Sequence, residues 1–173
     1  MIAILEVHDV TGKDDTSLLE TAADYWIEVK EALIGKENYV ILNIANEWVG
    51  NWDGQKWCDG YTSVIPRLRE AGIKNTIIVD AAGWGQYGQS VTDYGEQVFA
   101  ADPDANTMFS VHMYGTAGKN KATIARNLKL STDKGLCMIV GEFGWNHSDG
   151  DVDEEYILEY CNENSVGWLA WGW

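Results

Sequence analysis

The stretch YVILNIANEW, residues 39–48, passes abruptly from a short apolar run to polar and aromatic residues. The run is continuous rather than alternating and contains β-branched residues, which is typical of a parallel strand buried on both faces. Asn46, Glu47 and Trp48 follow where the run stops. A carboxylate in this position loses hydration unless a partner or a function compensates, so Glu47 is the first candidate functional residue.

Further apolar runs of this kind recur along the chain, and amphipathic stretches with helical spacing separate them. This alternation predicts right-handed βαβ units around one parallel sheet. Because no linker or low-complexity tract interrupts it, residues 1–173 are expected to form one domain. The expected strands are 2–8, 39–46, 75–81, 107–114, 136–143 and 166–173, and the expected helices lie within 17–33, 57–71, 91–100, 121–133 and 153–163.

Two architectures fit this pattern, an open doubly wound sheet and part of a (β/α)8 barrel. The first strand leads into VHDVTGKDD, which has neither GxGxxG nor a Walker-type GK[ST], so a nucleotide-binding sheet is disfavoured. Polar and aromatic residues instead gather at the strands' C-terminal ends, which converge on one face of a barrel. They are His8 and Asp9, Asn46 and Glu47, Asp80, His112 and Tyr114, Glu142, and Trp171.

The first helix carries a start signal, since Ser17 and Glu20 have the spacing of a capping box. This spacing predicts that Ser17 caps the helix.

The composition narrows the range of partners. With 27 acidic and 12 basic residues, the net charge of −15 disfavours nucleic acid and anionic membranes and leaves neutral or cationic ligands. A sugar polymer would suit this charge, although acidity can also serve solubility alone. Nine tryptophans and eight tyrosines supply either core packing or binding platforms. No run reaches the length of a membrane helix.

The three cysteines, Cys58, Cys137 and Cys161, lack metal-site spacing, and no metal or cofactor is predicted. Cys137 and Cys161 lie in apolar segments, where a buried thiol is expected.

Two glutamates each end an apolar strand, Glu47 in NEW and Glu142 in GEFG. Either one alone could be an ordinary carboxylate facing solvent, but the pair, with aromatic residues at neighbouring strand ends, indicates glycoside hydrolysis. In that chemistry one acid protonates the leaving oxygen while a carboxylate about 5 to 5.5 Å away attacks the anomeric carbon with retention.

The ordered set of motifs resembles glycoside hydrolase family 5, and the whole chain is similar to the family's bacterial β-1,4-mannanases. The resemblance implies a (β/α)8 barrel and a retaining, endo-acting hydrolase of β-1,4-mannan backbones, with Glu47 as acid/base and Glu142 as nucleophile. The motifs are NEW (46–48), VHMYG (111–115), GEFG (141–144) and LAWGW (169–173), together with EVHDVTG, VDAAGWGQ and EFGWNHSDGDVDE.

The resemblance also implies the substrate contacts. Asn46 would hydrogen-bond the sugar 2-hydroxyl, a contact that strengthens in the transition state. His112 and Tyr114 would line the site, with the Tyr114 hydroxyl lowering the pKa of Glu142 and keeping it ionised. Trp171 would stack under a sugar ring.

Three more residues are expected near the ligand. His8 matches the family's histidine at the end of the third barrel strand. Trp84 and Gln86, in the turn after the third strand present here, would contact neighbouring sugar units. His147 is expected in a loop, Asp9 and Asp80 are expected to support the site rather than react, and the surroundings of Trp173 stay open.

The chain departs from the family in its extent. The motifs match from the family's third strand to its eighth, about six βα units, so the family's arginine at the end of the second strand has no counterpart, and Arg67 and Arg69 fall in a helix. We therefore expect an open sheet with two unpaired edges. A fragment of a longer protein, a partial sequence, and self-association through the open edges are the alternatives, and a partial sequence is favoured.

MIAILEVHD is no signal peptide, so secretion follows from the family alone. Activity of the isolated chain is expected to be far below that of a complete barrel. Three other functions remain open, namely a β-1,4-glucanase of the same family, a non-catalytic sugar-binding protein, and an inactive fragment.

Overall fold

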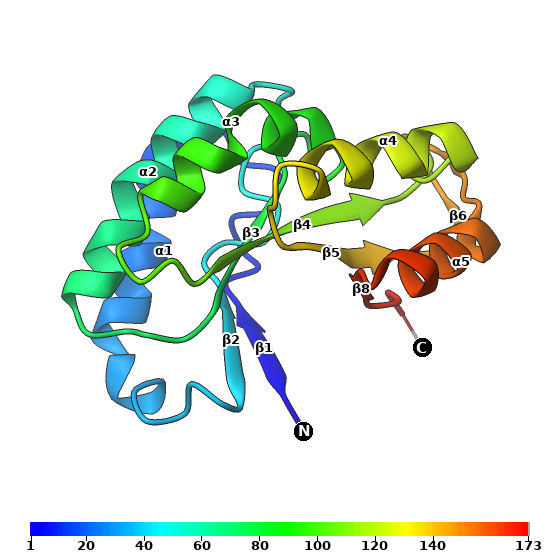
Figure 1. Ribbon diagram of the computed structural model, residues 1–173. Helices are drawn as coiled ribbons and strands as arrows, with labels where there is room; N and C mark the ends of the chain where they lie inside the picture. The colour runs from blue at the N-terminus through cyan, green and yellow to red at the C-terminus, as the bar shows by residue number, and fades with distance from the viewer. Residues whose placement is uncertain (173) are drawn as a thin grey trace.

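The computed structural model describes residues 1–172, which form one parallel sheet of six strands with helices along one side (Figure 1). The strands lie in chain order, so every neighbour in the sheet is also the next strand of the sheet in sequence. This order is that of consecutive βα units in a (β/α)8 barrel, as predicted. The strands are β1 (Ala3–Glu6), β2 (Val40–Asn43), β3 (Ile77–Asp80), β4 (Thr107–Met113), β5 (Met138–Phe143) and β8 (Gly167–Trp168).

Each of the first five sheet strands is followed by a helix, and successive helices pack against one another. A two-stranded hairpin of β6 (Asn146–His147) and β7 (Gly150–Asp151) interrupts the last of these connections. None of the described helices is long and apolar enough to cross a membrane. The helices are α1 (Thr16–Glu28), the short 3-10 helix η1 (Lys30–Ala32), α2 (Gly54–Glu70), α3 (Gly88–Ala100), α4 (Lys121–Thr132) and α5 (Glu154–Asn164).

The core lies between the sheet and the helices, and large aromatic residues of α2 and of the β2–α2 loop fill it. Trp57 and Tyr61 of α2 meet edge to face, and Trp48 packs against Tyr61 in the same way. Trp57 Nε1 also donates to the carbonyl of Asp80, 2.7 Å away, which ties α2 to the end of β3. Core packing therefore accounts for some of the tryptophans. The exposed ones are Trp52, Trp84, Trp145, Trp168 and Trp171.

The two outer strands correct the expectation of burial on both faces. β1 is mostly exposed, and both residues of β8 are exposed, whereas all four residues of β3 are buried. The reason is that, among the described strands, β1 and β8 each have one neighbour in the sheet rather than two. The predicted open edges are confirmed in the described residues.

Two local predictions were wrong. The cap of α1 is Asp15 rather than Ser17, because the Asp15 carboxylate accepts hydrogen bonds from the Ser17 backbone N–H and hydroxyl at 2.9 and 2.8 Å. Cys137 is exposed because its side chain points away from the buried side chains of Leu136 and Met138 on either side of it, while Cys58 and Cys161 are buried.

Candidate active site

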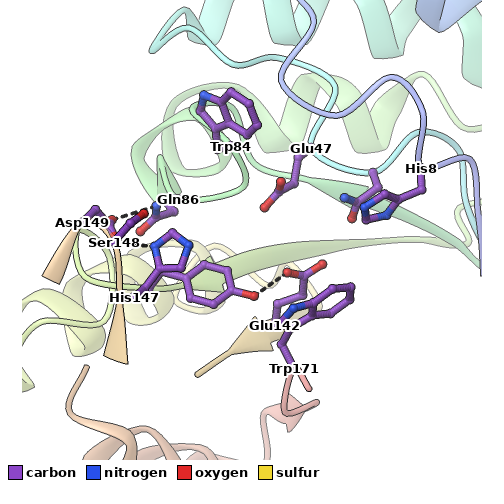
Figure 2. A pocket seen from close by; sticks show the side chains of 11 residues that line it. His8, Glu47, Trp84, Gln86, Glu142, His147, Ser148, Asp149 and Trp171 are labelled. Carbon is purple, nitrogen blue, oxygen red and sulfur yellow. Dashed lines mark hydrogen bonds and ion pairs between the residues drawn. The ribbon is translucent and has the colours of Figure 1, made fainter. Parts of the chain in front are cut away.

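A pocket of about 440 Å³ opens at the C-terminal ends of the strands (Figure 2). Eight of the nine site residues predicted from the sequence line it, and His112 is the exception. His147, Ser148 and Asp149, from the β6–β7 hairpin, also face the pocket. Its lining comprises His8, Asn46, Glu47, Trp84, Gln86, Tyr114, Glu142, His147, Ser148, Asp149 and Trp171.

Glu47 is held by a strained turn just beyond β2. Its φ of 48° lies in the left-handed region, which residues with a side chain rarely occupy and which recurs at functional sites. Two hydrogen bonds to the backbone groups of Glu47 fix the turn, because Glu47 N donates to the Asp80 side chain at Oδ2, 3.0 Å away, and Gly12 N donates to the Glu47 carbonyl at 2.8 Å. The turn therefore points the Glu47 carboxylate into the pocket.

Glu142 stands near the end of β5, where the register between β4 and β5 shifts after Val111. The shift pairs His112 with Glu142 across the two strands. From the same end of β4, the Tyr114 hydroxyl donates to Glu142 Oε2 at 2.7 Å. The hydrogen bond expected between Tyr114 and Glu142 is therefore present.

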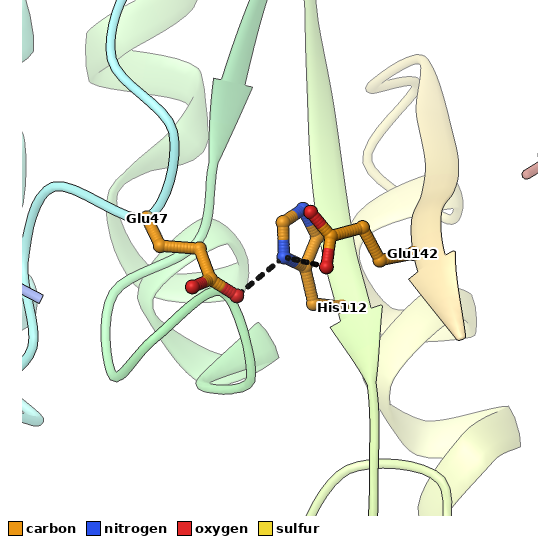
Figure 3. A group of neighbouring side chains, drawn as sticks. All are labelled: Glu47, His112 and Glu142. Carbon is orange, nitrogen blue, oxygen red and sulfur yellow. Dashed lines mark hydrogen bonds and ion pairs between the residues drawn. The ribbon is translucent and has the colours of Figure 1, made fainter. Parts of the chain in front are cut away.

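His112 lies behind this pocket and is not part of its lining, but it lines a neighbouring pocket that shares Asn46, Glu142 and Trp171. Its contact with the sugar stays a prediction. Its side chain is 2% exposed, and Nδ1 lies 2.6 Å from Glu47 Oε1 and 3.5 Å from Glu142 Oε2 (Figure 3). On the other side of the ring, Nε2 lies 3.3 Å from Asp80 Oδ1. The imidazole thus lies close to both pocket glutamates, on the side that faces away from the pocket.

The three carboxylates around His112 determine its charge. Burial lowers the pKa of an imidazole, but the charges and hydrogen bonds of Asp80, Glu47 and Glu142 outweigh burial and raise the pKa of His112 well above its usual range. Burial likewise raises the pKa of Asp80, yet His112, Asn43 and the Glu47 N–H lower it by a larger amount. His112 is therefore a buried imidazolium and Asp80 its ionised partner.

The pKa of Glu142 is raised above that of an ordinary glutamate. Burial is the largest cause, and the charges of Glu47 and Asp80 act in the same direction. His112 and the Tyr114 hydroxyl lower this pKa, but they do not offset burial. Tyr114 therefore lowers the pKa of Glu142 as expected, while burial makes the net shift upward.

The two pocket glutamates approach each other closely. One carboxylate oxygen of Glu47, one of Glu142 and a ring nitrogen of His112 all lie within 4.8 Å of one another. In the described part of the chain, these three side chains could also surround a metal ion. A metal ion at this position would have to displace the proton that the three neighbouring carboxylates favour on His112.

Two further features face the pocket. Asn46 is 1% exposed, and its Nδ2 donates to Thr11 Oγ1 at 3.0 Å, while its Oδ1 is buried without a partner among the described residues. Trp171 is 56% exposed, and its ring lies parallel to that of His8 at 6.1 Å. Both arrangements leave polar or aromatic groups available to a ligand.

The arginines of α2 lie away from this site. Arg67 pairs with Asp24 on the surface. Arg69 is buried and makes two hydrogen bonds to Asp102, at 2.8 and 2.9 Å. Both therefore join elements of the fold, and neither lines the pocket.

The sequence did not predict a role for Ser148 and Asp149. Both follow β5 in the loop that carries the hairpin, and no apolar run or strand end marks them. The signal that could have found them is the DGD turn in WNHSDGDVDE, since a glycine between aspartates is typical of a tight turn.

Comparisons with known proteins agree with this geometry. The chain matches the cellulase family (glycosyl hydrolase family 5) over residues 1–173. It is 59% identical to a mannan endo-1,4-β-mannosidase of Salipaludibacillus agaradhaerens, covering 100% of this chain and 56% of the relative. The chain therefore spans about half the length of this curated relative.

A solved structure and a more distant relative also match nearly the whole chain. The structure of a Streptomyces thermolilacinus β-mannanase with mannohexaose matches with a TM-score of 0.93 at 38% identity, over 100% of this chain and 59% of that one. A cellulase of Thermoanaerobacterium sp. is 25% identical over 99% of this chain and 48% of its own length. The similarity to these mannanases thus exceeds that to this cellulase.

Proposed function

Because the chain belongs to glycosyl hydrolase family 5, we propose that it carries the active site of a retaining enzyme that cleaves β-1,4-mannosidic bonds within mannan-type polysaccharides. The observation that most directly supports this proposal is that one carboxylate oxygen of Glu47 and one of Glu142 lie within 4.8 Å of each other. Retaining glycosidases hold their carboxyl groups about 5 to 5.5 Å apart, and inverting ones about 6.5 to 9.5 Å apart.

In this mechanism Glu142 attacks the anomeric carbon while Glu47 donates a proton to the leaving oxygen. The products of this step are a glycosyl ester on Glu142 and a shortened chain with a free hydroxyl. Glu47, now ionised, then removes a proton from water, which attacks the same carbon and releases Glu142. Each glutamate thus ends the cycle in the state in which it began.

His112 and Tyr114 support this cycle without touching the sugar bond. The His112 imidazolium lies 2.6 Å from Glu47 and 3.5 Å from Glu142, so it stabilises negative charge on either glutamate as that charge moves. Tyr114 donates to Glu142 and stabilises its ionised form. Asp80 holds both His112 and the Glu47 backbone in place.

The substrate contacts follow from the lining. Asn46 would bind the sugar 2-hydroxyl, and its buried Oδ1, which has no partner within residues 1–172, supports this role. Trp171 and His8 would flank one sugar, and Trp84 and Gln86 the neighbouring units. A neutral polymer also suits a chain with a net charge of −15. Because such a polymer is too large to enter a cell, we place the enzyme outside it.

The open edges bear on the isolated chain. β1 and β8 each leave one side unpaired among the described residues, and exposed strand edges favour association. We expect the 173-residue chain alone to self-associate and to turn over mannan slowly. Size-exclusion chromatography would show this as elution ahead of a 19.3 kDa monomer.

Activity on mannan and on carboxymethylcellulose, measured side by side, tests the proposed substrate. We expect release of reducing sugar from mannan at a rate well above that from carboxymethylcellulose, and loss of both rates in Glu142→Ala. Equal rates on the two polymers would favour the glucanase alternative, and unchanged turnover of mannan in Glu142→Ala would refute the catalytic assignment.

A further inference from the structure

The Asp149 carboxylate accepts more hydrogen bonds than is usual for a residue in a turn. Its carboxylate accepts from Gly115 N at 3.0 Å, from Thr116 N and Oγ1 at 2.9 Å each, and from Gln86 Nε2 at 3.1 Å. His147 Nδ1 lies 2.5 Å from the same carboxylate. One side chain therefore joins the β3–α3 turn, the loop after β4 and the β6–β7 hairpin.

The hairpin lies directly on the loop after β4. A Cβ on Gly115 would stand 2.4 Å from Gly150 N and 2.5 Å from the Asp149 carbonyl carbon, so only glycine allows this approach. Gln86 closes the contact from the other side, since its Oε1 accepts from Ala117 N at 3.1 Å. The oxygen and the nitrogen of the Gln86 amide thus both bond to other residues, so Gln86 stabilises the contact between the loops as well as lining the pocket.

His147 is the residue that this arrangement orients. Its ring packs on the Tyr114 ring at a centroid distance of 4.5 Å, and its side chain is 43% exposed in the pocket wall. Figure 2 shows Asp149 on the outer side of the His147 ring, and the remaining edge of the ring turned toward the pocket. Burial raises the pKa of Asp149, but the hydrogen bonds from His147, Gln86 and the loop outweigh burial and keep the carboxylate ionised.

We propose that Asp149 is a positioning residue that holds the Nδ1–H tautomer of His147, so that Nε2 faces the pocket as an acceptor for a substrate hydroxyl. A neutral imidazole carries its proton on one nitrogen only, and a carboxylate at Nδ1 selects which one. The second nitrogen is then left with a lone pair for the ligand. The identity of that ligand as a mannan unit rests on the proposed function.

The tautomer can be observed directly by long-range 1H–15N NMR of the chain at a pH where the ring is neutral. The chain has three histidines, so each pattern can be assigned by substitution. We expect the Nδ1–H pattern for His147 in the wild type and in Asp151→Ala, which removes an exposed aspartate of the same hairpin. In Asp149→Ala we expect the Nε2–H pattern. A wild-type His147 protonated on Nε2 would overturn the positioning role.

Titration with mannohexaose tests the sugar contact. We expect His147→Ala and Asp149→Ala each to weaken binding about five- to tenfold, which is the range of one hydrogen bond, and the double variant to lose no more than the stronger single one. Additive losses would overturn the coupling between Asp149 and His147. If the wild type shows the expected tautomer but binds no mannohexaose, the sugar contact is overturned together with the proposed function, whereas a wrong tautomer overturns the positioning role alone.

Discussion

Replacing His112 with asparagine removes the buried positive charge while leaving an amide that can still donate to Glu47. In the wild type the ring lies 2.6, 3.3 and 3.5 Å from oxygens of Glu47, Asp80 and Glu142. Two unit charges 4 Å apart interact by about 4 kcal/mol at an effective dielectric constant of about 20. Removing one member of a buried ion pair costs about 3 to 5 kcal/mol, and we expect His112→Asn to lose that much unfolding free energy.

The loss of unfolding free energy in His112→Asn should become smaller as pH rises. The pKa of His112 is raised in the folded state, so its stabilisation is complete below the unfolded value of about 6.5 and fades as pH rises through the folded pKa. Urea unfolding at about pH 6 and about pH 9 should therefore show a larger loss in His112→Asn at the lower pH.

A second readout of His112→Asn is the ionisation of Glu142, since His112 lowers the pKa of this carboxyl. Carboxyl 13C NMR should show Glu142 titrating at higher pH in the variant. His8→Asn is the matched control, because that imidazole is 53% exposed, and it should change neither readout. A His112→Asn protein with wild-type stability and an unshifted Glu142 titration would refute a buried imidazolium between the glutamates.

Three further perturbations test separate parts of the account. Tyr114→Phe removes a hydrogen bond that lowers the pKa of Glu142, so the acid limb of the activity profile should move to higher pH; a limb that moves to lower pH would contradict this. Asp102→Ala removes the nearest carboxylate of the buried Arg69 and leaves only Asp104, 3.8 Å away, as an ionic partner, so it should cost about 3 kcal/mol in urea unfolding. Since burial raises the pKa of Asp102 but the Arg69 and Thr107 hydrogen bonds lower it to about 2, the wild type's advantage should vanish as pH falls from about 4 toward that value. Trp171→Ala should raise KM for mannan about tenfold with little change in kcat, because an exposed stacking platform binds ground state and transition state alike.

The parallel sheet and the face that carries the site could be predicted from the sequence. Continuous apolar runs such as YVILNIAN belong to buried parallel strands, and the ends of such strands meet at one edge. That rule was enough to predict that Glu47 and Glu142, which are far apart in the chain, line the same pocket. Local pattern and strand topology therefore carried this part of the prediction.

The remaining details depend on strand register, burial and contacts between loops, none of which the periodicity of the sequence encodes. The depth of His112 follows from the register shift between β4 and β5, and the raised pKa of Glu142 follows from burial. Asp149 matters because three loops converge on it, and its neighbours in sequence do not reveal that convergence. The exposure of β1 likewise reflects a missing neighbour rather than its own apolar residues.

Covalent trapping tests the central assignment most directly. A 2-fluoro-mannoside with a good leaving group should react with the nucleophile and then hydrolyse slowly, so even a chain with slow turnover would be labelled in a single event. Peptide mass mapping should place the sugar on Glu142, and Glu142→Gln should remain unlabelled. A label on Glu47 or another residue, or none in a chain that still cleaves mannan, would contradict the proposed roles of the two glutamates.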